Sequence, residues 1–397
     1  MRKEKPKVSI ITVVYNGEKT IEQTIQSVLN QTYHNIEYII VDGCSEDNTI
    51  NIVKRYEKRI SRIIQEPDHG LYDAMNKGIR CASGELIGMI NSDDWYEADA
   101  VEKIVGCFNR TDAEVVHGDI NLIDEDGISH LVKPVALERI WYTMPISHPS
   151  VFVKRSVYER FGGFDLQYAI VADYELMLRL FCQHVKFEYL EEKIANFRRG
   201  GLTTTKEVEC VEELRSISLR YIENCDEREK YFPKIEEEYR WKIFRAMSHG
   251  DGAWMWRILE RKFQTLAEGI TIFGTGIWGI NCFKLLNSCS IKVSCFVDND
   301  RSKWGQKLQE ICIITPDELR NRPCNVLIAT RLYASEIAKQ LDTLENEELH
   351  YITLEELADC AYEEYAEAKV GKSGVNMSGK CGEIIELQMP GRVSEHI

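Results

Sequence analysis

The amino-acid sequence predicts an α/β protein with two unequal α/β units joined by a helical segment. Three observations lead to this class. Residues 1–205 alternate β-branched runs with stretches of helical apolar spacing, residues 206–268 are charged and helix-favouring, and a second alternation opens at Ile270. Strands and helices that alternate at this spacing are typical of a mostly parallel sheet with helices on its faces. We therefore expect four segments: 1–205, 206–268, 269–370 and a flexible tail over 371–397.

The first unit opens with a strand over Val8–Val14, because a run rich in Val, Ile and Thr stops at Tyr15-Asn16-Gly17. The elements expected after it are a helix over 18–30, a strand over 36–41, helices over 48–58 and 73–81, a strand over 85–90 and a helix over 98–108. In the second unit we expect strands over 270–273, 293–297 and 326–329, with a helix through Leu286 after the first.

Composition excludes several classes of protein. The chain has 397 residues, with 49 Lys and Arg against 64 Asp and Glu, a net charge of −15. Nucleic acid is therefore not expected as a partner, because phosphate binding needs a concentrated basic surface. The 13 cysteines include no C-x-x-C pair, which predicts free thiols in a reducing cytoplasm. No apolar run approaches the ~18 residues of a membrane span.

Carboxylates follow the predicted strands where an α/β sheet binds ligands. Asp42 ends the second strand, Asp93 and Asp94 follow the strand over 85–90, and Asp173 opens a later amphipathic helix. Adjacent carboxylates at the edge of a buried strand repel each other, so a hard divalent cation that also binds phosphate is the natural partner. The alternative is that these residues are N-caps of the helices that follow.

Several segments together resemble a known family in their order along the chain: Val8–Asn16, Ser27–Tyr33, Glu37–Gly43, Glu66–Gly78, Ala82–Glu85, Asn91–Asp94, His148–Ser150, Phe161–Asp165 and Ala172–Glu175. They resemble the family 2 glycosyltransferases of the GT-A fold, the nucleotide-sugar-dependent enzymes that assemble bacterial surface polysaccharides. The resemblance implies an inverting enzyme that transfers a sugar from a UDP-sugar to a glycan or lipid-linked glycan acceptor.

The resemblance also implies roles for the four carboxylates. Asp42 would bind the base of the nucleotide and Asp93 its ribose. Asp94 would ligate Mn²⁺ or Mg²⁺ as the last acid of the D-x-D pattern, whose first position here is Ser92. Asp173 would be the general base that deprotonates the acceptor hydroxyl.

Further residues are candidates by their place in the same pattern. Asp68 is expected near the nucleotide base, and Arg198 and Arg199 could clamp the diphosphate from a closing loop, since guanidinium groups suit phosphate. His148 could bind the metal or the donor phosphates, or be structural. Asp119, expected at the end of a strand, could touch the acceptor.

The second unit carries a glycine pattern, Gly274-x-Gly276-x-x-Gly279, between a strand and a helix, and Asp298 closes the next strand. This arrangement fits a dinucleotide-binding fingerprint. The region also resembles the Rossmann-like domains attached to sugar-modifying enzymes, many of which are not known dehydrogenases. NAD or another nucleotide could bind here. The alternatives to a simple transferase are thus a bifunctional enzyme that also modifies a sugar nucleotide, and a non-catalytic glycan-binding scaffold.

The segment from Trp241 to Phe263 mixes aromatic with basic side chains. Such a mixture suits contact with a membrane surface, which a lipid-linked acceptor would require. The alternative is aromatic packing between the two units. The sequence therefore predicts a cytoplasmic protein, with peripheral contact at the inner face of the membrane as one option.

Overall fold

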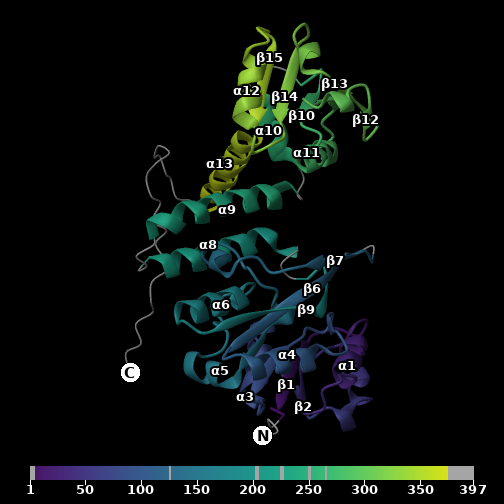
Figure 1. The fold of residues 1–397 in the computed structure, drawn as a ribbon, viewed down its shortest axis with the longest axis vertical. Coiled ribbons are helices and arrows are strands. Elements are labelled where there is room, and N and C mark those ends of the chain that lie inside the picture. The colour runs from purple at the N-terminus through teal and green to yellow at the C-terminus, as the bar shows by residue number, and fades with distance from the viewer. Residues whose placement is uncertain are drawn as a thin grey trace. The chain divides into compact units, whose positions relative to one another are not determined.

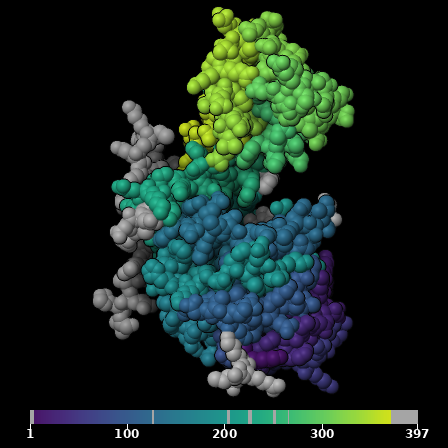
Figure 2. All heavy atoms as spheres, viewed as in Figure 1, coloured from purple at the N-terminus to yellow at the C-terminus, as the bar shows by residue number. Residues whose placement is uncertain are grey.

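A computed structural model describes residues 5–124, 127–201, 205–223, 228–248, 252–263 and 266–373. Residue contacts divide the chain into unit 1, residues 1–242, and unit 2, residues 243–397, which Figure 1 and Figure 2 draw from the same side. Each unit combines a β-sheet with α-helices, so the predicted α/β class is confirmed. The tail predicted over 371–397 lies outside the described residues from position 374 onward.

Within the described residues, unit 1 holds one nine-stranded sheet in the order β3-β2-β1-β4-β8-β6-β9-β5, with β7 paired to β6. The strands are β1 (Val8–Val14), β2 (Ile36–Asp42), β3 (Arg62–Gln65), β4 (Leu86–Met89), β5 (Trp95–Tyr96), β6 (Val115–Ile123), β7 (Ser129–Val132), β8 (Phe152–Lys154) and β9 (Phe187–Arg198). The α-helices are α1 (Ile21–Leu29), α2 (Thr49–Lys54), α3 (Leu71–Cys81), α4 (Ala100–Arg110), α5 (Arg155–Phe161), α6 (Ala172–Cys182) and α8 (Glu207–Ile222). Helix α9 (Arg228–Ser248) begins in unit 1 and continues past its last residue, Lys242. Short 3-10 helices are η1 (Glu57–Arg59), η2 (Leu137–Trp141) and η3 (His148–Ser150).

Only half of this sheet is parallel. Strands β3, β2, β1 and β4 run parallel, with Val14 opposite Asp42 and Asp42 opposite Gln65. In contrast, β8 is antiparallel to β4 and β6, and β5 is antiparallel to β9. Strands β6 and β9 are again parallel, so the mostly parallel sheet predicted from the sequence is confirmed for β3, β2, β1 and β4 and for β6 with β9, and is wrong for β5, β7 and β8. Strands of two or three residues, such as β5 and β8, are too short to show a periodic pattern.

Both faces of the central strands are covered. Ile11 and Val13 of β1 join the core that contains side chains of α3 and α6, whereas Ile10 and Val14 join the core that contains α1 and α4. Side chains alternate between the two faces of a strand. A strand buried on both faces must be apolar throughout, which explains the continuous run that revealed β1 in the sequence.

The connections place a switch point of the sheet between β1 and β4. Helices α1 and α2 contribute to one core and α3 to the other, so the chain changes sides of the sheet around β1. In open α/β sheets, ligands bind outside the carboxyl ends of the strands at such a switch point. The predicted carboxylates after β2 and β4 therefore lie at the expected edge.

Unit 2 has its own sheet. Among its described residues, six strands follow the order β12-β13-β11-β10-β14-β15, and all neighbours are parallel except β12 and β13. The strands are β10 (Ile270–Phe273), β11 (Val293–Val297), β12 (Lys307–Leu308), β13 (Ile311–Ile314), β14 (Cys324–Ile328) and β15 (Leu349–Thr353). The helices are α10 (Ala253–Lys262), α11 (Ile277–Ser288), α12 (Ala334–Asp342) and α13 (Leu354–Ser373), with 3-10 helices η4 (Arg301–Lys303) and η5 (Pro316–Leu319). The strands predicted over 270–273 and 293–297 are confirmed.

The aromatic residues between Trp241 and Phe263 are largely internal. Phe244, Trp254 and Phe263 are buried, and the Phe244 and Trp254 rings meet edge to face at 5.8 Å. A membrane contact through this segment stays a prediction, but these three rings are not exposed to make it. None of the described helices is long and apolar enough to cross a membrane.

Candidate functional site

Asp42 ends β2 and is fully buried. Its Oδ1 accepts a hydrogen bond from the Ser45 hydroxyl at 2.5 Å, and the Ser45 backbone N–H lies 3.2 Å from Oδ2. The Ser45 hydroxyl oxygen in turn accepts from the backbone N–H of Asn16, in the turn after β1. The carboxylate therefore joins the turns that follow the two central strands.

Asp68 lies against the same turn. A Cβ built on Gly43 would come within 2.5 Å of Asp68 Oδ2, so a larger residue at this position would displace the carboxylate. The other oxygen, Oδ1, accepts from the Gly70 N–H at 3.0 Å and fixes the start of α3. The structure thus brings Asp42 and Asp68 to one edge of the sheet, as the base-binding prediction requires.

Asp93 and Asp94 lie in a tight turn after β4, in which the Asp94 N–H bonds the Asn91 carbonyl at 3.1 Å. The Thr24 hydroxyl of α1 donates to the Asp94 carbonyl at 2.6 Å and holds this turn against the helix. Asp94 is fully buried. Burial and the neighbouring Asp93 carboxylate raise the pKa of Asp94 to about 8, and burial also raises the pKa of Asp93.

A cation fits this pair of carboxylates. Asp94 Oδ1 accepts from the backbone N–H of Arg198 at 2.9 Å, whereas its buried Oδ2 has no hydrogen-bond partner among the described residues. A buried carboxylate oxygen without a partner is costly unless something positive occupies it. Asp94, with Asp93 beside it, therefore suits a hard divalent ion whose remaining ligands come from a diphosphate. No described cluster of three or more His, Cys, Asp or Glu residues is arranged to hold a metal by itself.

Arg198 is the last residue of β9 and does not lie in a loop, contrary to the sequence interpretation. Its guanidinium donates to the Asp93 carbonyl and to Gln23 Oε1, and stacks 4.6 Å from the centre of the Trp95 ring. Arg198 thus clamps the turn that carries the two aspartates.

Arg199 and Asp119 lie apart from these contacts. Arg199 is exposed and forms an ion pair with Asp124 at 3.3 Å. Asp119 lies within β6, not at its end as the sequence suggested, and accepts from the Tyr189 hydroxyl at 2.6 Å. Strand β6 continues through Asp119 because it pairs with β9 and β7 over this stretch.

Asp173 is the second residue of α6 and is half-buried. Its Oδ1 accepts from the Tyr72 hydroxyl at 3.0 Å and from the Tyr174 N–H at 2.9 Å. Among the described residues, its Oδ2 has no hydrogen-bond partner. Contacts with α3 and α6 therefore hold one oxygen in place and leave the other without a hydrogen bond in the part of the chain described.

The helix-cap interpretation of these carboxylates is wrong. The N-cap positions of α2, α4 and α6 are occupied by Asn48, Asp99 and Val171. Asp42, Asp93, Asp94 and Asp173 therefore do not serve as N-caps of the helices that follow them.

His148 opens η3 and lies near Asp173. Burial lowers the pKa of His148, and the Asp173 carboxylate opposes this shift. Its ring is 6.1 Å from Phe164, which itself packs 5.1 Å from the Tyr72 ring. These contacts put His148 on the Asp173 side of the site, and its role as a metal ligand stays a prediction.

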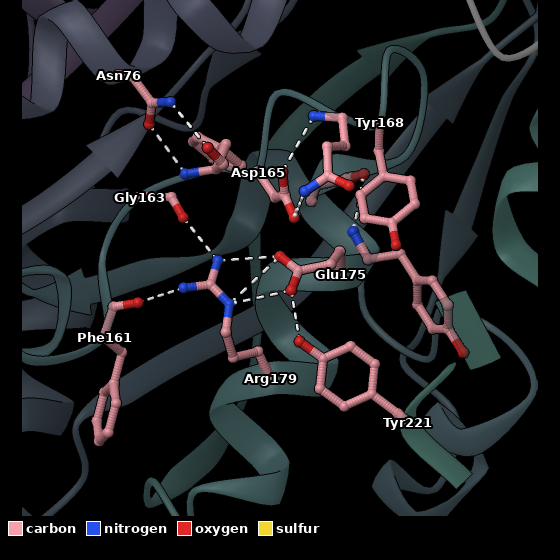
Figure 3. Close-up of polar contacts among 12 residues, drawn as sticks. Asn76, Phe161, Gly163, Asp165, Tyr168, Glu175, Arg179 and Tyr221 are labelled. Atoms are coloured by element: carbon pink, nitrogen blue, oxygen red, sulfur yellow. Dashed lines mark hydrogen bonds and ion pairs between the residues drawn. The ribbon is translucent and has the colours of Figure 1, made fainter. Parts of the chain in front are cut away.

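The sequence interpretation assigned no role to Tyr72 or to the ion pair of Glu175 and Arg179. Arg179 donates to Glu175 at 2.9 Å and to the carbonyl oxygens of Phe161 and Gly163. Figure 3 shows its guanidinium between the Glu175 carboxylate and these two carbonyl groups. Glu175 is buried. The i, i+4 spacing of Glu175 and Arg179 on α6 could have predicted this ion pair from the sequence. In contrast, no residue near Tyr72 in the sequence indicates that Tyr72 contacts Asp173.

In unit 2, the three glycines have different environments. Gly274 has φ +114°, a conformation that favours glycine, and a Cβ on Gly279 would lie 1.9 Å from the Gly274 carbonyl oxygen. Gly276, in contrast, has no other atom within 4 Å of its Cβ position. A cavity of about 440 Å³ lies here, lined among others by Gly276, Trp278 and Tyr333.

Asp298, which completes the predicted dinucleotide-binding fingerprint, is engaged within the protein. Its Oδ2 accepts from Lys303 Nζ at 3.0 Å and from the Thr275 hydroxyl, and its Oδ1 accepts from the Asp300 N–H at 2.9 Å. The Thr275 hydroxyl also accepts from Lys303 at 3.0 Å. A ribose hydroxyl would have to compete with these partners.

Comparisons with known proteins match parts of both units. The sequence profile of glycosyl transferase family 2 matches residues 9–141, and the profile described as C2185-like, N-terminal, matches residues 266–352. An uncharacterized glycosyltransferase of Mycobacterium tuberculosis is 32% identical over 200 residues, which cover 45% of this chain and 71% of the relative. A PGL/p-HBAD biosynthesis glycosyltransferase of Mycobacterium bovis is 27% identical over 207 residues, covering 50% of this chain and 80% of the relative.

Among solved structures, S. aureus TarS 1–349 aligns with a TM-score of 0.49 at 19% identity, over 62% of this chain and 74% of that one. The family profile, the identity to the M. tuberculosis relative and the share of that relative covered together establish the family. This chain belongs to glycosyl transferase family 2.

Proposed function

We propose that unit 1 transfers a sugar from a UDP-sugar to a hydroxyl of a glycan or lipid-linked glycan, with inversion at the anomeric carbon, in the assembly of a surface polysaccharide. The observation that carries this proposal is the buried, unpartnered Oδ2 of Asp94 beside Asp93, at the switch point of the sheet. A site built this way suits the diphosphate of a nucleotide sugar and the cation that accompanies it.

The donor is held by the carboxylates at the strand ends. Asp42 and Asp68 bind the base and Asp93 binds the ribose. Arg198, the last residue of β9, and Arg199 beside it would bind the diphosphate. Asp94, with His148 as a further candidate ligand, would hold Mn²⁺ or Mg²⁺. When bound, this ion neutralises charge on the departing nucleoside diphosphate.

Asp173 is the general base. Its open oxygen accepts the proton of the acceptor hydroxyl as the hydroxyl oxygen attacks the anomeric carbon. The bond between that carbon and the diphosphate oxygen breaks, and UDP leaves with the electron pair. One base is sufficient for this single displacement, and Tyr72 keeps the carboxylate in place from α3.

The proposal is tested by UDP release from a panel of UDP-sugars, with Mn²⁺ and with EDTA, in the presence of membrane-extracted acceptors. We expect metal-dependent release from one donor. Asp173→Asn should lose about 100-fold or more in turnover with donor binding retained, and Asp94→Asn should lose metal-dependent donor binding.

The matched control is Asp112→Asn, which removes an exposed carboxylate that pairs with Lys186 on the surface of unit 1. It should behave like the wild type. The proposal is refuted if the wild type shows no turnover and no metal-dependent donor binding. That result would favour a non-catalytic scaffold. Loss of donor binding in Asp173→Asn would show that this residue is not the base.

As a second candidate function, we infer that unit 2 is a Rossmann-like domain that binds a nucleotide in its 440 Å³ cavity. The supporting observation is Gly276, where a side chain would meet open space. The fold itself requires glycine at positions 274 and 279 but not at position 276. A phosphate group that approaches the backbone would explain why residue 276 is a glycine.

This inference predicts thermal stabilisation of unit 2 by a nucleotide. Gly276→Val should fold normally, because the site has room, and should lose the stabilisation. UDP and NAD⁺ are the two probes. NADH turnover would support the bifunctional alternative, and no stabilisation by either probe would contradict nucleotide binding in unit 2.

A further inference from the structure

Helix α8 contributes a carboxylate to the segment that carries the catalytic base. Glu213 Oε1 accepts from the Ala169 N–H at 2.9 Å, and its Oε2 accepts from the N–H groups of Ile170 and Val171 at 2.9 and 3.1 Å. One side chain therefore binds three consecutive backbone donors, directly before α6 and Asp173.

These donors have no substitute within their own segment. Val171 is the N-cap residue of α6, and its side chain has no atom that could accept a hydrogen bond. The first N–H groups of a helix lack intrahelical partners, and a carboxylate near them is favoured by both hydrogen bonding and the helix dipole. Glu213 thus supplies from α8 a carboxylate for the N–H of the N-cap residue, which a glutamate at the third helical position supplies in a capping box.

The held segment is coupled to Asp173. The Tyr72 hydroxyl contacts both the Ile170 carbonyl, at 2.8 Å, and Asp173 Oδ1, at 3.0 Å. Glu213 bonds the N–H of the same Ile170. A shift of residues 169–171 would therefore move the Tyr72 contact and the base together.

Other contacts make α8 a support along much of α6. The Tyr221 hydroxyl donates to Glu175 at 2.5 Å, as Figure 3 shows, and the Ser218 and Tyr174 hydroxyls are 2.8 Å apart. Helix α8 begins at Glu207, after the residues 9–141 that match the family profile.

We propose that Glu213 is a positioning residue for Asp173, so that α8 is required for transfer although it lies outside the part of the chain that the family profile matches. The proposal rests on the function proposed for unit 1. Because a small displacement of a catalytic group reduces the rate strongly, loss of this carboxylate acts on turnover and leaves donor binding, at the strand ends, unaffected.

The test compares Glu213→Gln with Glu209→Gln. Glu209 lies one turn earlier on α8 and is exposed, so the control makes the same change in charge on the same helix. In Glu213→Gln, an amide NH₂ must face at least one of the three backbone donors. We expect kcat to fall about 10- to 100-fold with the donor KM unchanged, and the amides of residues 169–171 to exchange faster with solvent. Glu209→Gln should match the wild type in both measurements.

Glu213→Asp is the second variant. It keeps the carboxylate on a shorter side chain, so kcat should recover part of the loss. The proposal is overturned if Glu213→Gln keeps wild-type kcat, or if Glu213→Asp is no better than Glu213→Gln while both retain wild-type thermal stability. Amide exchange separates this result from failure of the proposed function. An inactive wild type refutes the transferase assignment, whereas unchanged exchange at residues 169–171 in Glu213→Gln refutes the positioning role.

Discussion

Breaking the ion pair of Glu175 and Arg179 should destabilise unit 1 strongly. The Glu175 side chain is 3% exposed and that of Arg179 is 21% exposed. Removing one partner of a buried pair leaves an uncompensated charge and costs about 3–5 kcal/mol. Arg179→Met leaves the more deeply buried charge, so we expect a loss of about 4 kcal/mol in the free energy of unfolding. Glu175→Gln keeps an acceptor oxygen and should cost about 3 kcal/mol.

The double variant separates pairing from burial. With both charges gone, the remaining loss comes mainly from the carbonyl groups of Phe161 and Gly163, which Arg179 no longer bonds. Two unsatisfied carbonyls cost about 2–4 kcal/mol. The single losses sum to about 7 kcal/mol, so the cycle predicts a coupling energy of about 3–5 kcal/mol.

The assay is unfolding of the protein in urea, in which hydrogen exchange of peptides from α6 reports the unfolding of unit 1. Glu159→Gln is the control, because it removes an exposed i, i+4 pair with Arg155, whose side chains are 42% and 56% exposed. That change should cost no more than about 0.5 kcal/mol. Additive losses in the double variant, or a loss below about 1 kcal/mol in either single variant, would refute the reasoning.

Three further predictions concern the interior of unit 1. Burial lowers the pKa of His117 from 6.5 to about 4. Between about pH 4 and pH 6.5, the unfolded chain binds a proton at His117 that the folded chain does not bind, so the free energy of unfolding rises with pH. His117 should account for about 2 kcal/mol of the difference in the free energy of unfolding between pH 5 and pH 7. His117→Gln should remove that difference in unfolding measurements at the two pH values, and exposed His130→Gln should retain it. Tyr72→Phe removes the hydroxyl that bonds the catalytic base, so turnover should fall and stability should drop by about 1–2 kcal/mol; equal turnover would show that this bond is not needed. Gly88→Ala would place a Cβ 2.3 Å from the buried ring of Phe152, and a melting temperature equal to that of the wild type would contradict the expected loss of about 1–3 kcal/mol.

Local sequence patterns were sufficient for the central strands. The strands over Val8–Val14 and Val293–Val297 agree with the predicted bounds, because strands covered on both faces are apolar at nearly every position. The place of Asp42 at a strand end also followed from its position in the chain. These features depend on residues that are neighbours in sequence.

Local sequence patterns did not predict the direction of β8 or the continuation of β6 through Asp119. Both depend on pairing with strands far along the chain, and short strands carry little periodic signal of their own. The contacts of Arg198 could not be predicted locally either. The sequence shows two arginines before Gly200, but only the pairing of β9 with β5 and β6 brings Arg198 to Trp95 and the Asp93 carbonyl.

The sequence by itself determined that carboxylates follow the strands of an α/β sheet, because strand ends and helix starts are local features. Only the tertiary structure decided which of them meet, which buried oxygen of Asp94 lacks a partner, and that Glu213 holds the segment before Asp173. The residues that make these contacts are separated by up to 104 positions, as in the bond from Arg198 to Asp94. Contacts of this kind arise from the packing of whole elements, which no local pattern records.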